Sequence, residues 1–268
     1  MNRFNFCFIA ALTAIVTTAV VHAAGPNLDV AGFKIGMNED DAIPALKPHN
    51  ARFYINQPTS TIEGISEPIK PSVTAIATGT AALDGENMSL VFTLPPGKKV
   101  LWGIQRAVSY APDHRLSLDA TLAALRQKYG SESVPPSPAS PGVANLAWVF
   151  DAKGNLLPRD QAMGPYMRCT SILQNHLSNN DQSTFNDLQT GLRGAINEAV
   201  NYILITASVQ YTVKPGAPSA VYNLTVTIND GRLYGPALLA TRARVVEAVN
   251  ARTAKESKTI DQRGGPSL

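Results

Sequence analysis

Histidine is the side chain in this sequence best suited to general base catalysis or metal binding near neutral pH. Outside the N-terminal leader described below, the chain has three histidines: His49, His114 and His176. No two of them are four residues apart, the pattern His-Glu-x-x-His is absent, and no closely spaced pair of cysteines occurs. The sequence therefore predicts no metal site and no cofactor, and we assign no catalytic, cofactor-binding or metal-binding residue.

Nucleophilic catalysis stays open as an alternative. The chain has no Gly-x-Ser-x-Gly motif and no glycine-rich phosphate-binding motif. A dispersed Ser/His/Asp site is defined by geometry and has no fixed sequence order. His114 lies in a short polar segment between a predicted strand and a predicted helix, where a loop could present it to a substrate or simply leave it in solvent. We lean toward a non-catalytic protein, with an exported hydrolase as the alternative.

Residues 1–23 have the three-part pattern of a cleavable secretory signal peptide. Arg3 provides the positive start, residues 6–21 form an apolar run too short for a membrane anchor, and Val21 and Ala23 are small enough for the cleavage site. We predict cleavage after Ala23 and a periplasmic or secreted protein without a transmembrane anchor.

Cleavage would also leave a nearly neutral chain with one thiol. It removes Arg3, one of 23 Lys and Arg residues, against 20 Asp and Glu residues, so the net charge becomes about +2. Such a small charge does not favour a nucleic acid partner. The remaining cysteine, Cys169, has no intramolecular disulfide partner, so it is a buried inert thiol, a reactive thiol or half of an intermolecular disulfide.

Local patterns predict an α+β fold with antiparallel sheets and helices packed on one face. A helix capped by Ser117 has apolar residues spaced as one helical face and stops at Gly130. Trp102 and Trp148 lie in predicted strands and are expected in the core. The predicted helices cover 38–47, 117–129, 183–200 and 236–255, and the predicted strands cover 27–36, 73–78, 88–94, 99–110, 146–150, 155–157, 166–172, 202–213 and 221–228. Proline and glycine turns at 95–98 and 214–218 predict two hairpins. Residues 56–72 are expected to form a surface excursion and residues 174–183 a loop.

A proline-rich stretch divides the chain. Residues 131–142 contain four prolines, a composition typical of a linker. We therefore predict a first α+β unit over 24–134, a second over 143–257 and a disordered tail over 258–268. The helices that begin at Asn38 and Ser117 share a cap and an apolar spacing, and each precedes strands. The two units are therefore either a tandem duplication or a chance similarity of two amphipathic helices.

Residues 32–43, Gly-Phe-Lys-Ile-Gly-Met-Asn-Glu-Asp-Asp-Ala-Ile, resemble the opening of the SmpA/OmlA-type outer-membrane lipoproteins. The duplicated arrangement is similar to the β-lactamase inhibitor protein fold. Residues 124–130 and 147–154 resemble uncharacterised exported proteins of proteobacteria. The first two families bind other proteins with helices laid on an antiparallel sheet. The lipid-anchoring cysteine of the lipoproteins is absent, and Asn38 and Ala42 replace their usual Thr or Ser and Val.

The absence of recognisable site chemistry and these resemblances lead to the main expectation, and a structural or envelope-stress role, which rests on composition alone, stays open beside it. We expect a non-catalytic exported protein that binds an envelope protein or a small ligand through its sheet face. The sequence does not specify the oligomeric state.

Overall fold

The computed structural model describes residues 28–62, 64–65, 68–79, 84–136, 141–178, 201–213 and 216–262. The predicted leader and the predicted helix over 183–200 lie outside these residues. Helices and antiparallel strands both contribute, which confirms the α+β class.

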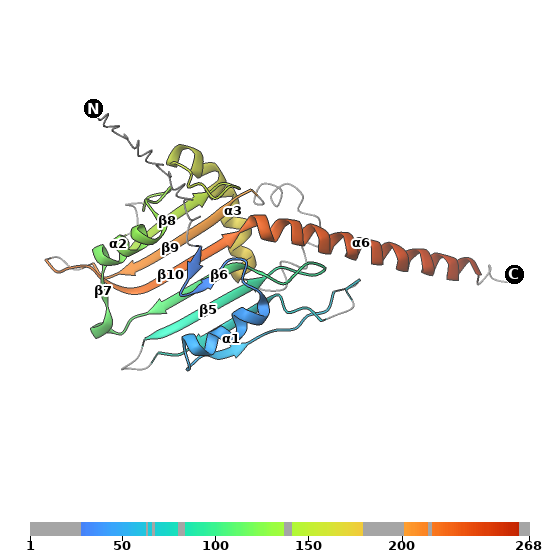
Figure 1. Cartoon of the computed structure of the whole chain (residues 1–268), viewed down its shortest axis with the longest axis horizontal. Helices are drawn as coiled ribbons and strands as arrows, with labels where there is room; N and C mark the ends of the chain where they lie inside the picture. Colours follow the sequence, from blue (N-terminus) through green and yellow to red (C-terminus); the bar gives the residue numbers. More distant parts are fainter. Residues whose placement is uncertain are drawn as a thin grey trace, which may run out of the picture.

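All the long strands belong to a single antiparallel sheet (Figure 1). In spatial order the strands are β3 (Tyr54–Asn56), β4 (Ser72–Ala77), β5 (Gly85–Phe92), β6 (Leu101–Ser109), β10 (Ala220–Asp230), β9 (Ile203–Tyr211) and β8 (Val143–Phe150), and β7 (Leu116–Ser117) pairs with β10. The antiparallel pairs β5 with β6 and β9 with β10 confirm the two predicted hairpins. The strands β6 and β10 pair with each other at the centre, so both predicted units contribute to one sheet.

One face of the sheet, called the α1/α2 face below, packs against helices α1 (Glu39–His49) and α2 (Leu118–Tyr129) (Figure 1). Both helices begin where predicted. A two-stranded hairpin, β1 (Asp29–Val30) with β2 (Phe33–Lys34), packs in the same core. We expected one continuous strand here, but Ala31 and Gly32 adopt positive φ angles and turn the chain back on itself.

The opposite face, called the α3/α6 face, packs against α3 (Arg159–Ser178) and the first turns of α6 (Gly231–Gln262). Helices therefore cover parts of both faces, and the expectation of helices on one face only is wrong. Trp102 belongs to this second core and Trp148 to the first, and both are buried as predicted.

Two sequence predictions are wrong in the segment that forms helix α3. Residues 166–172 were expected to form a strand and residues from 174 a loop, whereas the helix runs through to Ser178. The physical reason is tertiary packing. Ala162 and Cys169 are buried and Tyr166 is half-buried against the second core, a spacing that only a helix brings to one face.

Helix α6 starts earlier and ends later than predicted. Asp230 caps it by accepting a hydrogen bond from the backbone N–H of Arg232 at 2.9 Å. The helix continues to Gln262, so the predicted tail over 258–268 is wrong for 258–262. Its C-terminal part extends away from the sheet (Figure 1), and no helix of the described residues is long and apolar enough to span a membrane.

The loop before β4 packs closely against α6 near Arg244 and Ala248. Gly64 has a φ of +81°, and a Cβ placed there would lie 2.6 Å from the Cβ of Ala248 and 2.9 Å from the carbonyl oxygen of Arg244. Only glycine allows this close approach. Residues 56–72 were expected to form a surface excursion, yet Ile65 and Ile69 are buried in the second core.

Candidate functional site

The α1/α2 face contains a mainly apolar cavity, and helix α2 positions it. The Ser117 hydroxyl accepts a hydrogen bond from the N–H of Ala120 at 3.2 Å, which satisfies one free donor at the start of α2. At the other end, Trp148 Nε1 donates to the carbonyl oxygen of Gly130 at 2.8 Å. The Tyr129 hydroxyl donates to the carbonyl oxygen of Asp29 at 2.9 Å. These contacts fix α2 above the strands.

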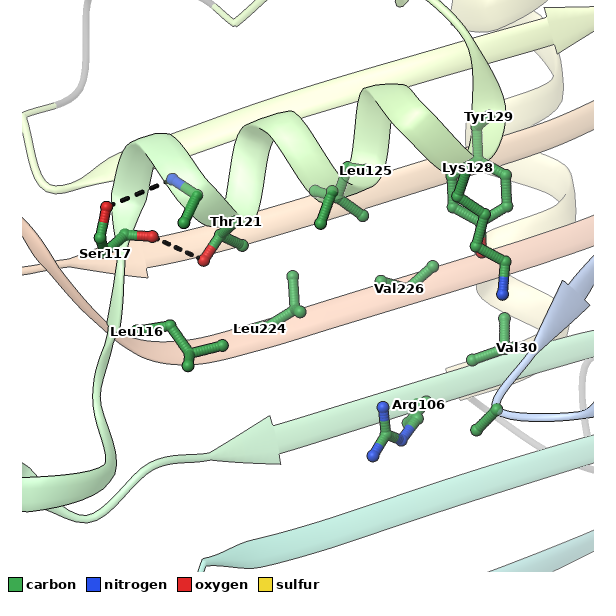
Figure 2. A pocket seen from close by; sticks show the side chains of 13 residues that line it. Val30, Arg106, Leu116, Ser117, Thr121, Leu125, Lys128, Tyr129, Leu224 and Val226 are labelled. Atoms are coloured by element: carbon green, nitrogen blue, oxygen red, sulfur yellow. Dashed lines mark hydrogen bonds between the residues drawn. The ribbon is translucent and has the colours of Figure 1, made fainter.

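Between α2 and the sheet lies a cavity of about 310 Å³, called the α2 groove below (Figure 2). Its lining is mainly apolar, and it is open to solvent along α2, where Ala120 and Ala124 are exposed. Figure 2 shows α2 as one wall, β6 and β10 as the floor and β1 at one end. The wall contributes Thr121, Leu125, Lys128 and Tyr129, the floor Arg106, Leu224 and Val226, and the two ends Val30 and Leu116.

Arg106 is the unusual member of the floor. On the two adjacent strands, the residues paired with Arg106 are Met88 and Val226, and both belong to the apolar core. The charged guanidinium of Arg106 therefore lies among apolar core residues. Its Nε donates to Glu86 Oε1 at 2.6 Å. No described residue accepts a hydrogen bond from its two terminal nitrogens, and about a third of the side chain is exposed. The groove therefore offers free, directional donors beside an apolar surface.

Glu86 is held by three partners from two elements. It accepts from Arg106, from Asn50 Nδ2 at 2.9 Å and contacts His49 Nε2 at 2.9 Å. Burial raises the pKa of Glu86, but the hydrogen bonds from His49, Arg106 and Asn50 outweigh this and lower it to about 2. The ionised carboxylate thus holds Arg106 in place at neutral pH.

A second cation, Lys128 of α2, also lines the groove. Lys128 Nζ is 2.9 Å from Asp29 Oδ1, and it also lies 5.5 Å from the ring centroid of Tyr129. Burial raises the pKa of the Tyr129 phenol, so its hydroxyl remains a neutral donor. The groove therefore combines a mainly apolar lining with two paired cations, Arg106 on the floor and Lys128 on the wall.

Each of the two histidines whose side chains the structure describes pairs with a carboxylate. His49 Nε2 contacts Glu86 Oε1 at 2.9 Å, and the exposed His114 has its Nδ1 3.2 Å from Asp84 Oδ1. Among the described residues, neither imidazole has a serine hydroxyl as hydrogen-bond partner. The side chain of His176 lies outside the described part. No group of three or more His, Cys, Asp or Glu residues in the described ranges could hold a metal ion.

Cys169 lies in the second core with about 1% of its surface exposed and forms no disulfide. The buried position agrees with the first of the three interpretations of this thiol.

Sequence reasoning missed the α2 groove. The one local signal was Arg106, which takes an inward position between Ile104 and Val108 in an apolar strand. A scan against protein-family models found no match, and neither the curated proteins nor the solved structures gave a match.

Proposed function

We propose that the mature protein is a non-catalytic binding module of the periplasm or extracellular space. Its ligand is a small amphipathic molecule with an apolar body and a carboxylate or similar anionic group. The observation that carries this proposal is the α2 groove, where an apolar wall and floor meet the unused terminal nitrogens of Arg106. The predicted leader supports the location.

The apolar part of the groove would supply most of the affinity. Each buried methylene contributes about 0.8 kcal/mol, and the groove volume lies at the small end of the range of about 300–1,000 Å³ for ligand pockets. A single medium-length chain suits this space better than a two-chain lipid.

Arg106 would supply the selectivity. A guanidinium binds a carboxylate through two parallel hydrogen bonds, and hydrogen bonds to charged groups contribute about 1.5–3 kcal/mol. A neutral alcohol of equal length would lose this contribution, and a primary amine would be repelled by Arg106 and Lys128.

Calorimetric titration of the chain from residue 24 onward tests the proposal. The probes are octanoate, decanoate and dodecanoate, with decanol and decylamine as matched compounds. We expect affinity to rise with chain length until the groove is filled and decanol to bind about tenfold or more weakly than decanoate. Arg106→Gln should remove the difference between acid and alcohol.

Two neighbouring alanines of α2 provide a matched pair of variants. Ala123 and Ala124 are both exposed, but only Ala124 lines the groove. Ala124→Trp should block decanoate binding, while Ala123→Trp should not. Equal binding by both variants, or equal affinity for acid and alcohol, would contradict the proposal. Turnover of p-nitrophenyl decanoate would instead support the hydrolase alternative.

A further inference from the structure

We propose a second binding site on the opposite face of the sheet, specific for a neutral oligosaccharide. The site is a groove of about 480 Å³ between α3 and strands β6, β10, β9 and β8. It does not depend on the ligand proposed for the α2 groove.

Side-chain hydroxyls and amides dominate this polar groove. Thr206 and Ser208 of β9 stand opposite Thr227 and Thr225 of β10. Gln105 of β6 stands on the other side of Thr227. In an antiparallel sheet these side chains recur about 4.8 Å apart across strands and about 6.8 Å apart along them. The result is a regular array of hydrogen-bonding groups on one surface.

Much of the hydrogen-bonding capacity of this array is unused. Gln105 Nε2 donates to Thr227 Oγ1 at 3.5 Å, and the Thr225 hydroxyl donates to Asn223 at 3.4 Å. The side chains of Thr206 and Ser208 make no hydrogen bond to any described residue, although both are only half-exposed. Both donors and acceptors are therefore available, which suits a ligand whose hydroxyls donate and accept at once.

The uncharged lining and the aromatic ring of Tyr166 indicate which class of ligand the groove would bind. None of the described residues that line it carries a charge, so an ionic ligand would lose water without gaining a counter-ion. Tyr166 lines the groove from α3 and is half-buried, and its phenol makes no hydrogen bond to a described residue. An aromatic ring with a polar tip packs against the C–H face of a sugar and still reaches a hydroxyl.

A buried amide on the same face of β10 is an independent observation. Asn229 lies two residues after Thr227 and is fully buried, and neither its Oδ1 nor its Nδ2 has a partner among the described residues. Unpartnered buried amides are rare in folded proteins. A bridging water or a polar ligand group next to Asn229 would satisfy both atoms.

Titration with named sugars tests the proposal. The chain from residue 24 onward is titrated by calorimetry with cellotriose, maltotriose and tri-N-acetylchitotriose, and with trigalacturonate and deacetylated chitotriose as charged comparators. We expect at least one neutral trisaccharide to bind saturably and both charged sugars to bind more weakly. Absence of saturable binding by all three neutral sugars, or preference for a charged one, would overturn the proposal.

Variants locate the binding and separate it from the first groove. Replacing Thr206 with Val and Ser208 with Ala together removes two hydroxyls and should weaken binding about tenfold. Thr74→Val, on the same face but outside the groove, is the control and should not change it. If the double variant is unstable, Asn145→Ala gives the same test, because Asn145 lines the groove from the edge strand β8 and is itself exposed. Arg106→Gln should leave sugar binding intact, and unchanged affinity in the groove variants would refute the site.

Discussion

Replacing Glu86 with Gln tests the electrostatic network beside the α2 groove. The substitution keeps the size of the side chain but removes the charge that His49, Arg106 and Asn50 stabilise. The pKa of Glu86 is about 2 in the folded protein, compared with an ordinary value of 4.5. Because the folded-state pKa is depressed, the ionised carboxylate stabilises the fold above pH 4.5. This stabilisation is lost as the pH falls toward 2.

The size of the effect follows from the two pKa values. A difference of about 2.5 in pKa corresponds to about 3 kcal/mol at pH 7. Because the side chain of Arg106 is about one third exposed, solvent screening reduces this, and we expect about 1–3 kcal/mol. About three quarters of the effect should remain at pH 4 and less than half at pH 3.

Urea unfolding of the wild type and Glu86→Gln at pH 7, 5, 4 and 3 measures this difference. Taking the difference between the two proteins cancels the titration of other carboxylates that do not contact Glu86. Glu247→Gln, on the exposed surface of α6, is the control and should change stability by less than about 0.5 kcal/mol at every pH. A Glu86→Gln protein as stable as the wild type at pH 7, or a difference that stays constant down to pH 3, would refute the reasoning.

Three further predictions concern other parts of the molecule. Asn229→Leu removes two buried polar atoms that have no partner in the described part of the chain, so urea unfolding should show unchanged or higher stability. A loss above about 1 kcal/mol would mean that the amide has a partner. Cys169 is buried, so Ellman's reagent should label it only in denaturant, and a non-reducing gel should show monomer. Rapid labelling of the native protein would contradict the burial. Residues 251–260 and 262 of α6 are exposed, so ending the chain at Asn250 should shift the thermal midpoint by less than about 4 °C, while a larger drop would show that this segment packs against the body.

Local rules in the sequence predicted the elements whose formation depends on local residues. The α2 helix was predicted from its cap at Ser117 and its stop at Gly130, and both hairpins from their proline and glycine turns. Helix α3 was missed because Tyr166 to Ile172 has residues that also suit a strand, and packing against the second core decides between the two. The early start of α6 depends on Asp230, whose cap forms only once β10 ends there.

The α2 groove could not be predicted from the sequence because distant segments form it. Asp29 lies beside Lys128, and Arg106 lies opposite Val226, through contacts that only the sheet pairing and the β1–β2 hairpin create. A single arginine in an apolar strand was the only local indication. The polar groove likewise requires β6, β10, β9 and β8 to be neighbours, although the alternation of polar residues in β10 was visible in the chain.

The two proposed sites share the central strands but face opposite sides. Gln105 and Arg106 are consecutive in β6, and successive side chains of a strand point to opposite faces, so one residue lines the polar groove and the other the α2 groove. In β10, Val226 and Thr227 divide in the same way. A ligand in one groove therefore does not occupy the other. Arg106→Gln should reduce decanoate binding alone, and the Thr206 and Ser208 double variant should reduce sugar binding alone. If either variant reduced both decanoate binding and sugar binding, the two grooves would be coupled through the backbone of β6 and β10. Such coupling would contradict the rigid separation of the two faces that the continuous register of β6 and β10 implies.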